Sequence, residues 1–160
     1  MPFMPNTAEV GPDFFDVLVN DPAGTHAVFA PPNNKVSLTD YAIGIHASSL
    51  VADGGTLQIG IGSLGDAIGQ ALIVRDRHSA EYRRILESIC PDGLAGRDLG
   101  RFEQGLYGCS EMFVNGFLKL IEAGIIRREV FGDVVLQQLL NRGTIADASV
   151  TPQTLRALLD

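Results

Sequence analysis

The sequence is short of basic residues and of long apolar runs, and each shortage excludes a class of partner. Lysine and arginine total 12 against 19 acidic residues, and the net charge is −7. Nucleic acids and anionic membranes both bind basic surfaces, so we expect neither as a partner. No stretch reaches the ~18–20 apolar residues of a membrane span. The first residues also lack the pattern of a signal peptide, in which a basic region is followed by a long apolar region.

Cysteines are also few. Cys90 and Cys109 lie apart in the sequence, without the spacing of a metal site or of a CxxC redox pair. Such thiols are reduced in the cytoplasm, so we predict a cytoplasmic location and no bound metal. What the chain does have is apolar residues, 46% of the 160, with only 19% charged. This composition is typical of a globular protein, and the length suits one domain with a sizeable core.

Prolines divide the chain into two parts. Residues 1–36 are interrupted at Pro5, Pro12, Pro22, Pro31 and Pro32. We expect an irregular lead-in segment there, with a short helix or strand at 13–19 and a strand at 26–30. Residues 37–160 have the alternating helical and extended patterns of an α/β domain.

The first half of this domain part contains a helix, a strand and a second helix. Ser37 is a good N-cap for a helix that stops before residues 53–55. A β-branched strand follows at 55–62. The next helix is expected from Ser63 through Val74, and a charged connection is expected over 75–84.

Three more helices are expected further along. Apolar residues recur at helical spacing at Tyr82, Ile85, Leu86 and Ile89. Residues 91–104 contain several Gly and Asp residues, and we expect an exposed loop there. Helical patterns return at 133–140 and at 152–159, and the second of these has Thr151 as its cap and a proline at its first position.

The most informative stretch runs from Gly105 to Gly124. It predicts a short strand, a turn and an amphipathic helix that begins at about Ser110, with Gly124 as a left-handed C-cap. Glu111 then lies in the first helical turn, where backbone N–H groups favour a carboxylate by roughly 0.3–1 kcal/mol. An ionised carboxylate suits a nucleophile, but the same residue can simply complement the helix dipole. This stretch alone leaves both interpretations open.

A glycine-rich loop follows the predicted strand. Gly60–Gly65 match the G-x-G-x-x-G pattern, which predicts free backbone N–H groups and a positive φ at Gly62. A nicotinamide-binding fold also needs an acidic residue about 20 positions on, at the end of a second strand. Glu81 holds that position but lies in a helical pattern, which disfavours nicotinamide binding. A P-loop is excluded because no Lys-Ser or Lys-Thr follows the glycines.

Several motifs together resemble one enzyme family. They are Asp53-Gly54-Gly55-Thr56-Leu57-Gln58-Ile59-Gly60-Ile61-Gly62, Asp66-Ala67, Gly108-Cys109-Ser110-Glu111-Met112-Phe113, Asn115-Gly116 and Glu122-Ala123-Gly124-Ile125-Ile126. The combination is similar to the pattern of the acetyl-CoA hydrolase/transferase family, which includes 4-hydroxybutyrate and acetate CoA-transferases. The resemblance implies an α/β fold of the CoA-transferase (NagB/RpiA) type. It implies a mostly parallel sheet flanked by helices, as one incomplete domain of a longer enzyme.

The resemblance also implies roles for particular residues. It assigns Glu111 as the nucleophile that forms a glutamyl-CoA thioester. It places Gln58, Gly60, Ile61 and Gly62 in the loop that lines the site and stabilises the oxyanion, with the N–H of Ile61 or Gly62 as donor. Coenzyme A is then a substrate, and the partners are an acyl-CoA and a small carboxylate. The implied reaction is CoA transfer between carboxylic acids, or acyl-CoA hydrolysis.

The chain departs from the family at several points. Cys109 stands where the family has His, Asn115 where it has Asp, and Gly65 where many members have Pro. Family members also have a second lobe, so we expect this chain to be poorly active alone. We expect its apolar ends, 1–5 and 155–159, to associate with such a lobe or with a second copy. These departures leave open a non-catalytic CoA- or nucleotide-binding module and, less favoured, an NAD-dependent oxidoreductase.

Overall fold

The computed structural model describes residues 10–24, 26, 30–146, 149 and 151–159. The chain divides into two compact units, Met1–Pro31 and Pro32–Asp160. No helix within the described ranges is long and apolar enough to cross a lipid bilayer.

The described part of the first unit has little regular structure. It contains two short 3-10 helices, η2 (Pro12–Phe14) and η3 (Pro22–Gly24). The sequence predicts a short helix or strand at 13–19; residues 13 and 14 belong to η2, and residues 15–19 form neither a helix nor a strand. The strand predicted at 26–30 falls largely on residues that lie outside the described part of the chain.

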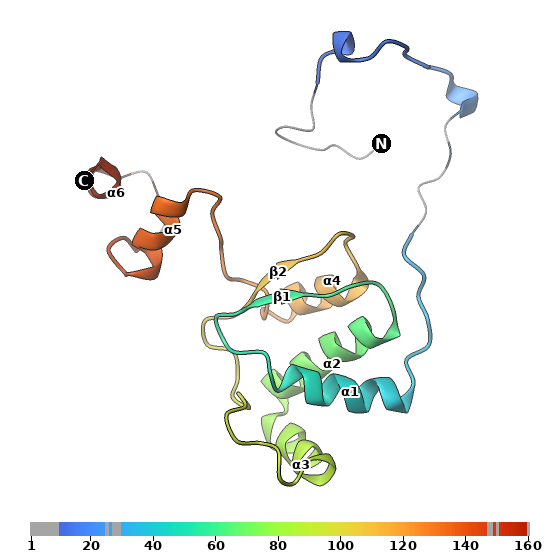
Figure 1. Ribbon diagram of the computed structural model, residues 1–160, viewed down its shortest axis with the longest axis vertical. Coiled ribbons are helices and arrows are strands. Elements are labelled where there is room, and N and C mark those ends of the chain that lie inside the picture. The colour runs from blue at the N-terminus through green and yellow to red at the C-terminus, as the bar shows by residue number, and fades with distance from the viewer. Residues whose placement is uncertain (1–9, 25, 27–29, 147–148, 150, 160) are drawn as a thin grey trace. The chain divides into compact units, whose positions relative to one another are not determined.

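The described residues of the second unit form a mixed α/β structure, as predicted (Figure 1). In chain order its elements are α1 (Leu38–Ser48), β1 (Thr56–Gln58), α2 (Ser63–Arg77), α3 (Ser79–Ile89), β2 (Tyr107–Cys109), α4 (Asn115–Glu122), α5 (Val134–Asn141) and α6 (Pro152–Leu159). The predicted caps at two of these helices are confirmed. Ser37 and Asp40 form a reciprocal capping box at α1, and the Thr151 hydroxyl accepts the N–H of Thr154 at 3.0 Å in α6.

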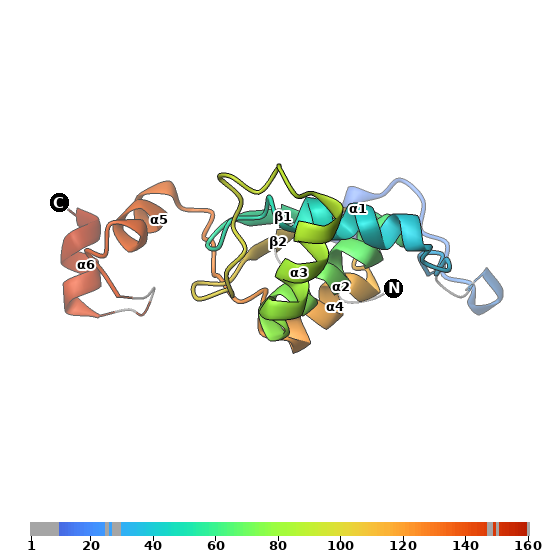
Figure 2. The same cartoon turned by 90° about the horizontal axis from the view of Figure 1, so that it is seen from below.

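β1 and β2 pair in parallel, which confirms the predicted strand direction. The register places the last residue of β1, Gln58, opposite the last residue of β2, Cys109. A parallel pair needs a long crossover, and α2 and α3 provide it. Figure 1 shows α2 between α1 on one side and α4 with the two strands on the other. Figure 2 gives the view from below, in which α1, α2 and α4 lie together.

Two apolar clusters hold these elements together. The larger joins the strands to α2 and α4 and contains Leu57, Ile59, Leu72, Phe102, Leu106, Val114, Phe117, Leu120 and Ile125. The smaller joins α1, α2 and α3 and contains Ile45, Ala71, Tyr82 and Leu86. Full burial of one such side chain contributes about 1.5–3 kcal/mol. The larger cluster therefore anchors the sheet from which the candidate site is built.

The connection predicted over residues 75–84 is wrong. α2 continues to Arg77, and α3 begins at Ser79. The sequence suggested an exposed connection because Arg75 is charged, but this side chain is fully buried. Its guanidinium lies 4.4 Å from the centre of the Phe102 ring. The charged residue at this position is therefore compatible with a continuous helix, because its side chain is paired with Asp98 inside the protein.

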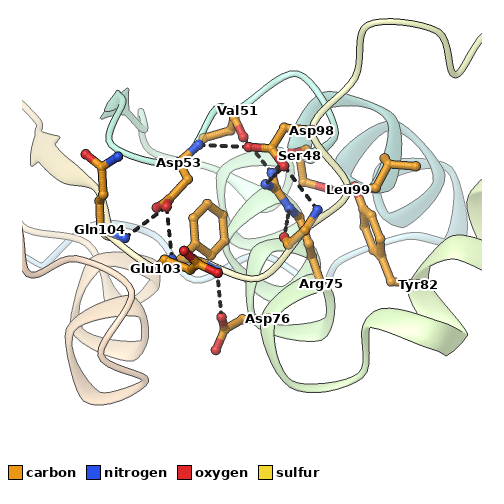
Figure 3. Close-up of polar contacts among 12 residues, drawn as sticks. Ser48, Val51, Asp53, Arg75, Asp76, Tyr82, Asp98, Leu99, Glu103 and Gln104 are labelled. Atoms are coloured by element: carbon orange, nitrogen blue, oxygen red, sulfur yellow. Dashed lines mark hydrogen bonds and ion pairs between the residues drawn. The ribbon is translucent and has the colours of Figure 1, made fainter.

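Arg75 ties the end of α1 to the loop that precedes β2 (Figure 3). Its guanidinium donates to the carbonyl oxygens of Ser48 and Gly100, at 3.0 and 2.7 Å. It also donates to the carbonyl of Val51 and pairs with the Asp98 carboxylate at 2.9 Å. Four groups from three segments are thus held by one side chain.

Asp53 fixes the point at which β2 begins. Its carboxylate accepts the N–H groups of Glu103 and Gln104, each at 2.9 Å (Figure 3). It also accepts the N–H of Gly105 at 2.9 Å. Partial burial raises the pKa of Asp53, but the backbone N–H bonds outweigh this effect and the pKa lies below its usual value. The ionised carboxylate therefore holds β2 in register with β1.

Candidate active site

The carboxyl ends of β1 and β2 meet at one edge of the parallel pair, and a loop leaves each strand there. Residues 59–62 lead from β1 into α2, and residues 110–114 lead from β2 into α4. A hydrogen bond joins the two loops: the Ser110 hydroxyl donates to the carbonyl of Ile59 at 2.8 Å. All the residues that the sequence predicts for the site lie in or beside these loops.

The glycine loop exposes its backbone. A Cβ atom at Gly60 or Gly62 would have no heavy atom within 4 Å, and the Ile61 side chain is exposed. Gly62 has φ +131° and ψ 170°, which confirms the predicted positive φ. Gly62 is also the N-cap of α2 and has no side chain to cover the N–H groups there. Backbone N–H groups of this kind can bind an oxyanion or a phosphate.

Gly65 lets the glycine loop fold back against the first turn of α2. A Cβ atom there would stand 2.6 Å from the carbonyl oxygen of Gly60 and 2.8 Å from Cγ2 of Ile59. Both distances are far too short, so this position needs a residue without a side chain. The shape of the loop is therefore tied to Gly65.

Gln58 and Cys109 lie side by side at the open edge of the strand pair. Leu57 is buried in the core, so its neighbour Gln58 points away from it and is exposed. Cys109 is exposed as well. The Gln58 amide and the Cys109 thiol are thus available to a ligand at this edge.

Glu111 lies between β2 and α4, and not in a helical turn as predicted. α4 begins at Asn115, with Val114 as its N-cap. The reason is the Ser110 hydroxyl, which donates to the carbonyls of Ile59 and Met112 (2.7 Å for the latter) and does not cap a helical N–H. The helix dipole falls off within the first turn. The dipole of α4 therefore does not act on the Glu111 side chain as the sequence predicts.

The Glu111 side chain is exposed to solvent. Within the described part of the chain, its carboxylate has no hydrogen bond or ion pair. Phe113, two positions on, is 67% exposed. Glu111 is therefore a free carboxylate on a loop next to a glycine loop with accessible N–H groups, and a bound ligand would have to remove its water.

α4 anchors the Glu111 loop to the core. The apolar face that the sequence predicts for this helix comprises Phe113, Val114, Phe117, Leu118, Leu120 and Ile121. Of these, Val114, Phe117 and Leu120 are buried, whereas the other three are exposed. The apolar stripe is therefore narrower than the sequence predicts. The Phe117 ring lies against β2, where a Cβ atom at Gly108 would overlap it.

The predicted C-cap of α4 is confirmed. Gly124 has φ +72°. Its N–H donates to the carbonyl of Ile121 and the N–H of Ile125 donates to that of Leu120, both at 2.9 Å. This is a Schellman motif, and the packing of Leu120 with Ile125 in the core completes it.

Two cavities lie near these elements. One of about 290 Å³ opens beside the first turns of α2 and α4, and its polar lining includes Asp66, Gln70, Asn115 and Lys119. A larger groove of about 520 Å³ lies between α1, α2 and α3 and is lined mostly by apolar side chains. Glu111 lines neither of these two cavities.

Other classes of site find little support in the described residues. Their His, Cys, Asp and Glu side chains form no group of three that could hold a metal ion. Glu81, at the position where a nicotinamide-binding fold needs its acid, lies in the first turn of α3 and pairs with Arg84 at 4.0 Å. The element immediately before α3 is the helix α2, so Glu81 does not follow a strand as that fold requires.

Ser110 is the residue whose role sequence reasoning missed. It belongs to the Ser-Glu-Met motif, which was the only signal that pointed to it. One of its two hydrogen-bond partners, Ile59, belongs to a distant segment, and no local sequence pattern predicts this contact.

Comparisons with protein-family models, with curated proteins and with solved structures found no match to this chain. Any function must therefore be argued from the site itself. The site offers an exposed carboxylate beside backbone N–H groups, an arrangement suited to nucleophilic attack on a carbonyl carbon with stabilisation of the resulting oxyanion.

Proposed function

We propose that the protein reacts with CoA thioesters through Glu111, either to transfer CoA between carboxylic acids or to hydrolyse an acyl-CoA. The observation that carries this proposal is the hydrogen bond between the Ser110 hydroxyl and the Ile59 carbonyl. It holds the loop of the candidate nucleophile beside the loop with accessible backbone N–H groups. The motif resemblance supports the same assignment, and with it an α/β fold of the CoA-transferase type.

The chemistry proceeds by exchange of acyl groups without any change of oxidation state. The Glu111 carboxylate attacks the thioester carbonyl, and the CoA thiolate leaves to give a mixed anhydride. The thiolate then attacks the glutamyl carbonyl and expels the first carboxylate, which leaves a glutamyl-CoA thioester. An acceptor carboxylate reverses these two steps and leaves as a new acyl-CoA. Water can instead hydrolyse the thioester to Glu111 and free CoA.

Each attack creates a negative oxygen that the protein must stabilise. The N–H of Ile61 or Gly62 is the proposed donor, because this part of the loop is accessible and ends at the N-terminus of α2. One such donor is typically worth about 2.7–4 kcal/mol of transition-state stabilisation. Gln58, exposed at the end of β1, would line the same site.

The decisive experiment is peptide mapping by mass spectrometry after the chain is mixed with acetyl-CoA alone. We expect a CoA-sized adduct on the Glu111 peptide that hydroxylamine removes. Glu111→Gln should abolish the adduct, because the amide is not a nucleophile, and should leave the free energy of unfolding within about 0.5 kcal/mol for an exposed residue. Glu87→Gln, an exposed glutamate on α3, is the control that keeps the adduct. An adduct on another glutamate, or one that survives in Glu111→Gln, would sink the assignment.

A second candidate is a CoA- or nucleotide-binding module without catalysis. The observation that favours it is the exposure of Glu111, whose carboxylate has no hydrogen bond or ion pair within the described part of the structure. Thermal unfolding with CoA and with NAD separates the candidates, since a ligand at 100 times its Kd stabilises by about 2.7 kcal/mol. Stabilisation by CoA without an adduct would indicate the binding module, and stabilisation by NAD alone an oxidoreductase.

A further inference from the structure

We infer that Ser110 is a positioning residue, whose hydroxyl sets where the Glu111 carboxylate stands relative to the glycine loop. This inference rests on the proposed role of Glu111 as nucleophile. The Ser110 hydroxyl oxygen lies 2.8 Å from the carbonyl oxygen of Ile59 and 2.7 Å from that of Met112. One hydroxyl proton is thus shared between two acceptors on two different loops.

The two acceptors define two different constraints. Met112 follows Glu111 directly, so the bond from Ser110 to the Met112 carbonyl closes a tight turn around the Glu111 backbone. Ile59 directly precedes Gly60, so the bond to the Ile59 carbonyl fixes this turn against the start of the glycine loop. A single side chain therefore sets both the local path of residue 111 and its separation from the candidate oxyanion donors.

The rest of the fold does not depend on this hydroxyl. The parallel pair is held by its own backbone bonds, such as that from the N–H of Tyr107 to the carbonyl of Gly55 at 3.0 Å. Ile59 and Val114 are buried in the larger apolar cluster and anchor one end of each loop. Between these anchors, Glu111 and Phe113 are exposed. The Ser110 hydroxyl thus constrains the exposed part of the 110–114 loop. We expect its loss to lower the reactivity of Glu111 more than the stability of the fold.

The test compares three serine variants. Ser110→Ala removes both bonds, and Ser110→Thr keeps the hydroxyl. Ser48→Ala is the matched control: Ser48 is fully buried, and its hydroxyl bonds to the carbonyl of Ile45 and to the Tyr82 hydroxyl, both at 2.9 Å, in the smaller cluster. Ser48→Ala should therefore lower stability without any effect on the loops.

The kinetic readout is the rate constant of CoA-adduct formation at Glu111 in the full chain, measured against acetyl-CoA concentration. We expect Ser110→Ala to lower the limiting rate constant about tenfold, which corresponds to about 1.4 kcal/mol, and to leave the half-saturating concentration unchanged. Misplacement of a reacting group slows the chemical step even where binding is intact. Ser110→Thr should restore the rate to within about twofold, and Ser48→Ala should match the unmodified chain.

A structural readout keeps this test separate from that of the proposed function. In millisecond hydrogen-exchange mass spectrometry, peptides that span residues 59–62 and 110–114 should exchange faster together in Ser110→Ala, and not in Ser110→Thr. Unchanged exchange in Ser110→Ala would overturn the inference whatever the activity. An adduct that forms equally fast in Ser110→Ala, or as slowly in Ser110→Thr as in Ser110→Ala, would overturn it while the proposed function stands. Absence of any adduct on Glu111 in the unmodified chain would overturn the proposed function, and with it the positioning role.

Discussion

Gly62 is the residue at which the site depends most directly on the absence of a side chain. Its φ of +131° with ψ 170° lies in a region that essentially only glycine adopts. A Cβ atom there has open space, so any cost of a substitution is conformational. We predict that Gly62→Ala lowers the free energy of unfolding by about 1–3 kcal/mol and slows CoA-adduct formation, because the loop must change its path. Urea unfolding and adduct mass spectrometry measure the two effects.

Gly60→Ala is the matched control for this prediction. A Cβ atom at Gly60 also has open space, and Gly60 is not among the glycines with positive φ. The expected change in the free energy of unfolding is within about 0.5 kcal/mol. Equal destabilisation by the two substitutions would show that the backbone angle at Gly62 is not the cause.

At the scale of elements, the position of β2 depends on carboxylates in and around the preceding loop. Partial burial raises the pKa of Asp53 and of Asp98, but N–H bonds to both, and for Asp98 also the Arg75 guanidinium, lower it further than burial raises it. Both folded-state pKa values therefore lie below the ordinary value of 3.8. The unfolded chain then binds more protons, so the stabilisation is present above this value and is lost as the pH falls through the folded-state pKa values.

We predict that Asp53→Asn lowers the free energy of unfolding by about 1–3 kcal/mol at pH 7, because three N–H bonds lose a charged acceptor. The difference from the unmodified chain should shrink below about pH 4, where the unmodified chain also loses the charge. Urea unfolding at a series of pH values measures this. Asp92→Asn, at an exposed position of the loop between α3 and β2, is the control that should stay close to the unmodified chain. A difference that is constant across this pH range would contradict the assigned role of the Asp53 charge.

The helices and helix caps could be predicted where they depend on residues close together in the sequence. α2 and α3 follow from apolar spacing, and the caps at Ser37, Thr151 and Gly124 follow from residue type, because each contact involves near neighbours in the sequence. The late start of α4 and the burial of Arg75 were not predictable. The partners of Ser110 and Arg75, such as Ile59 and Gly100, come from distant segments and act only once the chain has folded.

The candidate site shows the same division. Its two loops follow parallel strands, and the register of β1 and β2 brings the carboxyl ends of both strands to one edge. The surroundings of Glu111 were predicted wrongly, since they depend on a side-chain bond to Ile59 that no motif encodes. A sequence motif was thus enough to select Glu111 as the candidate, whereas its surroundings depend on tertiary contacts.

At the scale of the whole molecule, the second unit exposes an unusual amount of apolar surface. Leu38 and Leu50 at the ends of α1 are 88% and 71% exposed, and Ile85 and Ile89 on α3 are 45% and 41% exposed. The two isoleucines line the apolar groove of about 520 Å³ between α1, α2 and α3. Large apolar patches are uncommon on monomeric proteins and favour association. The apolar end predicted at 155–159 adds exposed leucines on α6, whereas the end at 1–5 lies outside the described residues.

We therefore predict that the chain associates with itself through the α1–α3 groove. Sedimentation velocity over a range of concentrations should show a shift to dimers or larger species. The double variant Ile85→Glu, Ile89→Glu should shift the equilibrium to monomer, because burial of two carboxylates in an apolar contact is unfavourable. Circular dichroism should stay unchanged, since both side chains are already partly solvated. Ala80→Glu, at an exposed position on the same helix, adds charge away from the groove and should leave association intact. A chain that is monomeric at high concentration, or association that the double variant does not weaken, would show that the groove is not a contact between copies.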